Sequence, residues 1–209
     1  MAILLLLGFL LQNPTLVPVN EGNRDKSFAA YIKKLNAAVT KRDVKALHAL
    51  TAPDVISGGF GEKDQRGWEK FRDLWELERR DAPVWDILAD LIDLGFFREG
   101  PAIFVSPYVA WKFPKDLDPS QHLVVLRDPL PLRKEPRREA PAVATLAFDI
   151  VRRVGEEKEL EPFAWVEVET LKGVRGFVQA AEVRSPQMAR VQISNREGNW
   201  RLVVLDRGR

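Results

Sequence analysis

The sequence predicts an α+β protein in which a mainly helical N-terminal unit with short strands precedes a β-barrel and a closing β-hairpin. Three observations support this prediction. Apolar residues recur at helical spacing through residues 25–94, and after Gly100 the spacing changes to that of β-strands. Residues 115–121 form a polar connector, and strand-like runs continue from His122 to the end. The composition, with 45% hydrophobic and 30% charged residues, is that of a folded globular protein.

Residues 1–24 are expected to be a signal-like apolar segment followed by a disordered linker. The apolar run at 2–11 suits the core of a secretory signal and is shorter than the roughly 20 residues that a membrane-spanning helix needs. No Lys or Arg precedes the run, so a buried N-terminal strand or helix is the alternative. The chain has no cysteine, which is compatible with export. The prediction is an exported protein, periplasmic or extracellular, without a stable membrane span.

Four helices are predicted within the unit at residues 25–118. The first covers 25–40, with Asp25 or Ser27 as its cap and an apolar stripe of Phe28, Tyr31, Ile32, Leu35 and Val39. A short second helix follows Asp43, a third covers 66–78, and a fourth begins at Pro83 and ends near Gly95. Two strands, at 102–105 and 108–113, are expected to complete this unit.

The rest of the chain is predicted to be strands, in a barrel at 119–186 and a hairpin at 187–209. Strand-like runs occur at 122–126, 142–154, 163–170, 175–178, 189–194 and 200–205. Gly198 suits the turn between the last two, because glycine tolerates a positive φ angle. An isolated hairpin is not stable in water, so this one is expected to pack on the strands near 102–113.

One motif in the strand-rich region points to a known family. Trp165 is followed by Gly173-x-x-Gly176-Phe177-Val178, with a proline-bearing loop at 132–136 and an apolar strand at 140–146 before it. This stretch resembles the bacterial SH3-like domain, and the whole arrangement is similar to exported bacterial proteins of unassigned function. The resemblance implies a barrel and an envelope location, and it carries no catalytic residues.

The resemblance implies a non-enzymatic binding protein of the bacterial cell envelope. Its ligand would be peptidoglycan or another envelope protein. A basic cluster surrounds the first barrel loop, and aromatic residues of such barrels line a groove. The candidate ligand-binding residues are therefore Arg133, Trp165, Arg175 and Phe177, with core packing as the alternative for Trp165. A barrel that has no small ligand and docks another protein is a second hypothesis.

Few residues suit catalysis or cofactor binding. The chain has two histidines, His48 and His122, and neither has the spacing of a metal site or a catalytic triad. Asp86, Asp90 and Asp93 share one helix face, which is either a paired-carboxylate site or a solvated surface. The formal net charge of +2 argues against a nucleic-acid partner. We therefore predict no enzyme, no metal and no cofactor.

A third hypothesis places the function in the helical unit. The region from Phe28 to Ile56 is loosely similar to cone-shaped α+β folds that host small-molecule isomerases and hydrolases. In this alternative the unit binds or converts a small molecule, in a polar pocket containing Asp86 or His48, and the barrel is an accessory.

Overall fold

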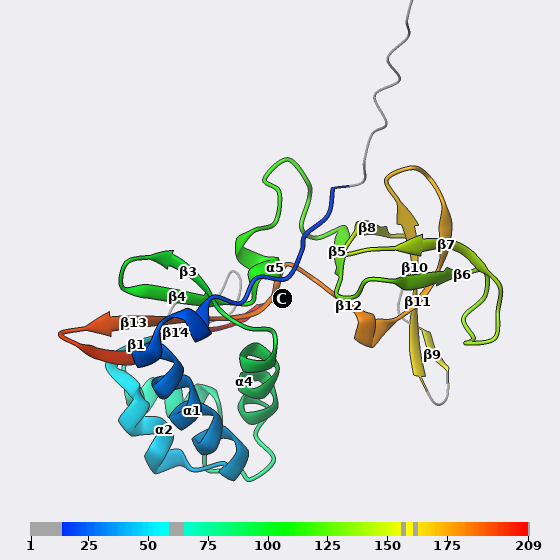
Figure 1. Cartoon of the computed structure of the whole chain (residues 1–209). Coiled ribbons are helices and arrows are strands. Elements are labelled where there is room, and N and C mark those ends of the chain that lie inside the picture. Colours follow the sequence, from blue (N-terminus) through cyan, green and yellow to red (C-terminus); the bar gives the residue numbers. More distant parts are fainter. Residues whose placement is uncertain (1–13, 59–64, 156–157, 161–162, 209) are drawn as a thin grey trace, which may run out of the picture. The chain divides into compact units, whose positions relative to one another are not determined.

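The computed structural model describes residues 14–58, 65–155, 158–160 and 163–208, with 158–160 described by their backbone alone. The chain divides into two compact units (Figure 1). We call residues 17–122 and 184–208 the helical unit, and residues 14–16 with the described part of 123–183 the strand unit. Helices and strands are both present, so the predicted α+β class is confirmed.

The helical unit contains a six-stranded sheet in the order β2-β1-β14-β13-β4-β3. The pairing of β1 with β14 is parallel, and the other pairs are antiparallel. The sequence therefore brings the C-terminal hairpin, β13 and β14, into the middle of a sheet begun by the N-terminal half. The strands are β1 (Thr51–Gly58), β2 (Gln65–Arg66), β3 (Phe97–Gly100), β4 (Ile103–Ser106), β13 (Met188–Arg196) and β14 (Asn199–Gly208).

Helices α1 to α4 pack on one face of this sheet (Figure 1). Two of them begin at the predicted capping residues: Asp25 accepts hydrogen bonds from the backbone N–H groups of Ser27 and Phe28, and Asp43 accepts one from Ala46. The helices are η1 (Gly22–Arg24), α1 (Lys26–Lys41), α2 (Val44–Leu50), α3 (Trp68–Leu74), α4 (Val84–Asp93) and α5 (Tyr108–Trp111).

Aromatic rings form the centre of the helical unit's core. The ring of Phe28, which is fully buried, stacks on Phe104 with 3.9 Å between the ring centroids. Trp200 and Phe96 contact the same Phe28 ring edge-on, at 5.0 and 5.2 Å. Helix α1 is thereby fixed to strands β4 and β14, so the space between helices and sheet is filled by side chains.

The strand unit contains most of an eight-stranded sheet in the order β12-β5-β8-β10-β11-β6-β7, with β9 paired to β10. Residues 14–16 add a short segment, because Thr15 pairs with Asp149. Among the described strands, β12 and β7 at the two ends do not pair, so no closed barrel forms. The elements are β5 (His122–Val125), β6 (Leu130–Arg133), β7 (Ala142–Leu146), β8 (Ile150–Arg153), β9 (Lys158–Leu160), β10 (Phe163–Thr170), β11 (Arg175–Gln179), η2 (Ala180–Glu182) and β12 (Val183–Arg184).

Two local predictions are wrong. The segment predicted as a strand at 108–113 contains the short helix α5, because Pro107 lacks the N–H that would continue the ladder of β4. Strand β1 was missed, because it contains Pro53 and follows α2 without a turn. Its neighbours β14 and β2 come from distant or short segments, so the pairing is a tertiary effect.

Within the described residues, no helix is both long and apolar enough to cross a membrane. The apolar run at 2–11 lies outside the described residues.

Candidate functional site

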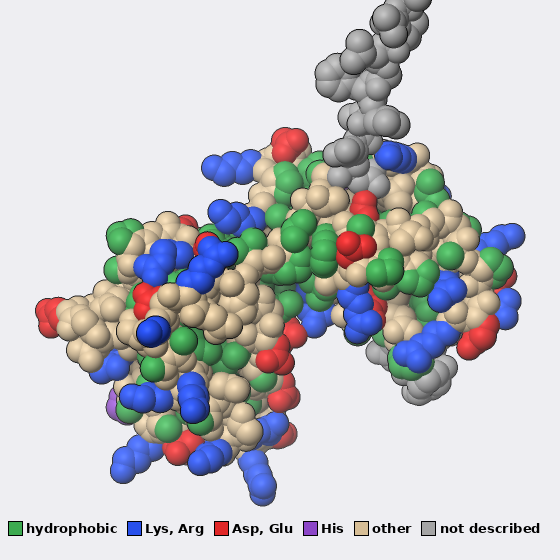
Figure 2. All heavy atoms as spheres, viewed as in Figure 1, with side chains coloured by type: hydrophobic (Ala, Val, Ile, Leu, Met, Phe, Trp, Pro, Cys, Tyr) green, Lys and Arg blue, Asp and Glu red, His purple; other side chains and the backbone are tan. Residues whose placement is uncertain are grey.

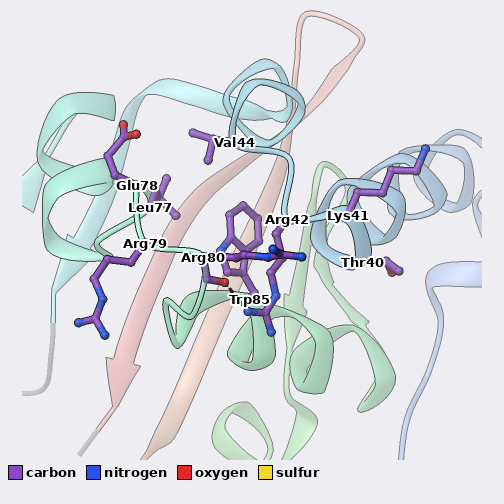
Figure 3. A pocket seen from close by; sticks show the side chains of 9 residues that line it. All are labelled: Thr40, Lys41, Arg42, Val44, Leu77, Glu78, Arg79, Arg80 and Trp85. Carbon is purple, nitrogen blue, oxygen red and sulfur yellow. Dashed lines mark hydrogen bonds between the residues drawn. The ribbon is translucent and has the colours of Figure 1, made fainter.

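A pocket of the helical unit has a volume of about 760 Å³ (Figure 3). It lies between the C-terminal end of α1, the start of α2, the segment that precedes α4, and the first turn of α4. The volume is within the usual range of small-molecule sites. The lining residues are Thr40, Lys41, Arg42, Val44, Leu77, Glu78, Arg79, Arg80 and Trp85.

Trp85 combines two properties at this pocket. Its side chain lines the pocket although only 2% of the residue is exposed. The indole Nε1 is buried and has no hydrogen-bond partner among the described residues. A buried polar group without a partner costs free energy, so such a group calls for an explanation.

Contacts with Arg80 and Asp86 hold the side chain of Arg42 in place. Arg42 follows α1 in the left-handed conformation, with φ 52°, which turns the chain towards α2. One guanidinium nitrogen, Nη1, donates to the backbone carbonyl of Arg80, and Nη2 lies 3.3 Å from Asp86 Oδ1. A guanidinium has five N–H donors, so three remain available for a ligand.

The other charges of the pocket fall into two groups. Arg79 pairs with Glu76 and Asp81 at 2.8 and 3.0 Å, and these contacts raise the pKa of Arg79. Glu78 lies 3.8 Å from Arg72. Among the described residues, the side chains of Lys41 and Arg80 have no ion-pair partner, so the pocket keeps positive charge.

Figure 3 shows how these groups are arranged. Arg42 and Arg80 lie next to Trp85, whereas Glu78 and Arg79 point away from it. Figure 2 shows the wider setting: Lys and Arg side chains gather over the ends of α1 and α2, and acidic side chains follow α4. The part of the pocket nearest Trp85 is therefore its most basic part.

The structure brings together two of the four residues predicted to bind a ligand. Arg133, at the end of β6, and Trp165, in β10, line one groove of about 250 Å³ in the strand unit. Trp165 is 4% exposed, and Arg133 Nη1 donates to the carbonyl of Ala140 at 2.8 Å. The groove is also lined by Arg127, Pro129, Leu130, Pro131, Arg138, Gln179 and Glu182.

The other two predicted residues do not line this groove. Arg175 lies at the start of β11, where its Nε is 3.0 Å from Glu169 Oε2. Phe177 is half-buried in β11 and opposite Arg133 in the strand pairing.

The residues considered for catalysis are dispersed. His48 is exposed and stacks on Trp68 with 4.2 Å between ring centroids, and the ring Nδ1 of His122 contacts the carbonyl of Asp118. Asp86 pairs with Arg42, and Asp90 lies 3.0 Å from Arg184 Nη2. Asp86 thus contacts a pocket residue, whereas the three aspartates form no site of their own.

Sequence reasoning missed the pocket, because Arg42 and Arg80 lie in a turn and a loop that carry no motif. One signal was present: residues 76–81 are a run of charged residues, interrupted by Leu77, shortly before the predicted helix that contains Trp85.

No protein-family model and no curated protein matches the chain. Solved structures match at low similarity. A Nostoc punctiforme protein of unknown function with a cystatin-like fold is 9% identical, with 87% of this chain and 86% of that chain covered and a TM-score of 0.29. An NTF2-like protein of unknown function from Pseudomonas putida is 11% identical, with coverage of 88% and 84% and a TM-score of 0.28. A Shewanella frigidimarina protein proposed to be a ketosteroid isomerase is 8% identical, with coverage of 87% and 94% and a TM-score of 0.29. At these TM-scores the likeness assigns no activity.

These findings correct the predicted resemblance to the bacterial SH3-like domain, which is wrong. The matching structures are described as NTF2-like, cystatin-like and ketosteroid isomerase, and the described strands form no closed barrel. The motif misled because Trp165, Gly173 and Gly176 describe one hairpin, β10 and β11, with its turn and a close strand contact. Such a hairpin is a local unit that many sheets contain.

The predicted function, an envelope protein that binds its ligand through an SH3-like barrel, is wrong for the same reason. The comparisons also give no support to a signal peptide or secretion.

Proposed function

We propose that the helical unit binds a small organic molecule in the pocket beside Trp85, with the strand unit as an accessory part. The observation that carries this proposal is a pocket of about 760 Å³ in which a buried tryptophan is placed among charged side chains. Ligand sites combine apolar surface with a few polar groups that orient the ligand. Here Val44 is partly exposed and offers apolar surface, and the nearly buried Leu77 and Trp85 lie behind the pocket wall.

The aromatic core favours this pocket over the interior of the unit. Phe28, Phe104 and Trp200 fill the space between α1 and the sheet. A ligand there would have to displace packed rings, whereas the pocket beside Trp85 is already open.

We propose binding rather than catalysis. The lining residues include no histidine and no cysteine, and their one carboxylate, Glu78, points away from Trp85. Nucleophilic catalysis needs a nucleophile within hydrogen-bond reach of a base. Thr40 is the one hydroxyl among the lining residues, and no base lines the pocket next to it.

The test is an NMR screen of a small-molecule library against the ¹⁵N-labelled full chain. A ligand of this site shifts the backbone resonances of 40–44 and 77–80 and one indole resonance. The variant Val44→Phe fills part of the pocket and is expected to weaken binding about tenfold or more. The control Ala49→Phe adds the same ring at an exposed position of α2 that does not line the pocket. Ligands whose shifts cluster elsewhere, or a library without any shift at the pocket, would overturn the proposal.

A further inference from the structure

The charge balance near Trp85 points to the kind of molecule that the pocket accepts. Arg79 is paired with Glu76 and Asp81. Arg80 and Lys41 have no ion-pair partner among the described residues. A positive charge left without a partner in a concave site attracts anions, because the low-dielectric walls concentrate its field.

Arg42 adds directed donors to this charge. Its contacts with the Arg80 carbonyl and with Asp86 use Nη1 and Nη2, and they fix the guanidinium plane. A planar guanidinium held in this way binds a carboxylate with less loss of entropy than a freely rotating side chain. The hydrogen bond from Nη1 also links Arg42 to the backbone of Arg80, so the two arginines are held close to each other.

Trp85 supplies a buried donor at the wall of the pocket. Figure 3 shows the side chains of Arg42 and Arg80 beside its ring. The buried Nε1 has no acceptor among the described residues, and an oxygen of a ligand that reached it would supply one. Val44, which is half-buried, offers apolar surface in the same pocket.

We propose that the ligand is a small organic carboxylate, whose charge contacts Arg80 and Arg42 and whose apolar body lies against Trp85. This inference rests on the proposed function, since it names the class of molecule that the same pocket binds. The inference goes further because the pocket must then prefer an anionic molecule over a neutral molecule of the same shape.

The experiment compares 2-naphthoate with its neutral counterpart, 2-naphthamide, on the ¹⁵N-labelled full chain. The two probes have nearly the same size and apolar surface and differ in charge. The chain has six tryptophans, and the indole resonance absent from Trp85→Phe belongs to Trp85. We expect 2-naphthoate to shift this resonance in a saturable way and to bind about tenfold more tightly than 2-naphthamide.

Two variants locate the charge. Arg80→Ala is expected to weaken 2-naphthoate about tenfold and to leave 2-naphthamide unchanged. Lys33→Ala, which removes an exposed cation of α1 that does not line the pocket, is expected to change neither. Calorimetry gives the same affinities without the assignment, so the test holds even if Trp85→Phe does not fold.

The outcomes separate the two proposals. Equal binding of both probes at Trp85 overturns the inference about charge and leaves small-molecule binding intact. An equal loss of 2-naphthoate affinity in Arg80→Ala and Lys33→Ala also overturns it, because a general charge effect would then explain the preference. Absence of any shift at Trp85 with either probe, together with an unsuccessful library screen, overturns both.

Discussion

Oδ2 of Asp25 lies 2.6 Å from Nη2 of Arg98, so the residue that begins α1 is also bound to strand β3. The other oxygen, Oδ1, accepts hydrogen bonds from the hydroxyl and backbone N–H of Ser27 and from the N–H of Phe28. One carboxylate therefore caps the start of α1 and fixes it to a strand that is 73 residues away in the sequence.

These contacts predict a pH dependence of stability. Hydrogen bonds from Ser27 and Phe28 and the contact with Arg98 lower the pKa of Asp25 from 3.8 to about 2. A carboxylate whose pKa is lowered by folding stabilises the fold above its unfolded-state pKa, and this contribution is lost as the pH falls towards 2. We expect Asp25→Asn to cost about 1 kcal/mol at pH 7 and close to nothing near pH 2. Urea unfolding across this range measures both values, and a pH-independent cost would contradict the prediction.

The aromatic cluster predicts a large loss for one truncation. Phe28 is fully buried and contacts the rings of Phe104, Trp200 and Phe96. Phe28→Ala is expected to destabilise the helical unit by about 3–5 kcal/mol, because the packed rings collapse only partly into the cavity. Chemical unfolding is the measurement, with Lys33→Ala as a control on the exposed face of α1. A loss below 1 kcal/mol would show that the ring is not part of the core.

Gly176 predicts the effect of a single methyl group in the strand unit. A Cβ atom at this position would lie 2.6 Å from the carbonyl oxygen of Arg133 and 2.8 Å from Leu132 Cγ. Gly176→Ala must push β6 away from β11, and we expect a cost of about 2–3 kcal/mol. Gly100→Ala is the matched control, since its Cβ would meet nothing within 4 Å. Equal thermal stability of the two variants would refute the close strand contact.

The hydrogen bond between Trp75 and Ser57 is expected to contribute to the stability of the helical unit. Trp75 Nε1 donates to Ser57 Oγ at 3.1 Å, and both residues are buried. Ser57→Ala leaves the indole N–H without an acceptor, so it is expected to cost about 1–3 kcal/mol. In the Ser57→Ala variant, Trp75→Phe should lower the free energy of unfolding by less than it does in the wild type, because it also removes the unpaired donor. A double-mutant cycle from urea unfolding gives the coupling, and additive losses would contradict it.

Local signals predicted several helices of this protein. Asp25 and Asp43 precede periodic apolar residues, and α1 and α2 begin directly after them. Cap and period act within a few residues, which is why they can be read without the fold. The segment at 108–113 shows the limit: its alternation is typical of a strand, but Pro107 interrupts the ladder and α5 forms.

The candidate site depended on distant contacts. Arg42 donates to the carbonyl of Arg80 and to Asp86, which lie 38 and 44 residues later in the chain, on either side of Trp85. Arg133 and Trp165 were predicted together and do line one groove, but the family to which they were assigned was wrong. A hairpin motif specifies a turn and a close contact, and the number and closure of strands depend on all the pairings.

The sequence by itself determined the α+β class, the caps and apolar stripes of the first helices, and the final hairpin, because each is set by neighbours along the chain. The tertiary structure decided that β14 pairs in parallel with β1, that the described strands of the other unit form no closed barrel, and that a basic pocket forms beside Trp85. These features arise from contacts between residues tens of positions apart, whose geometry is fixed only when both elements are packed in the same core.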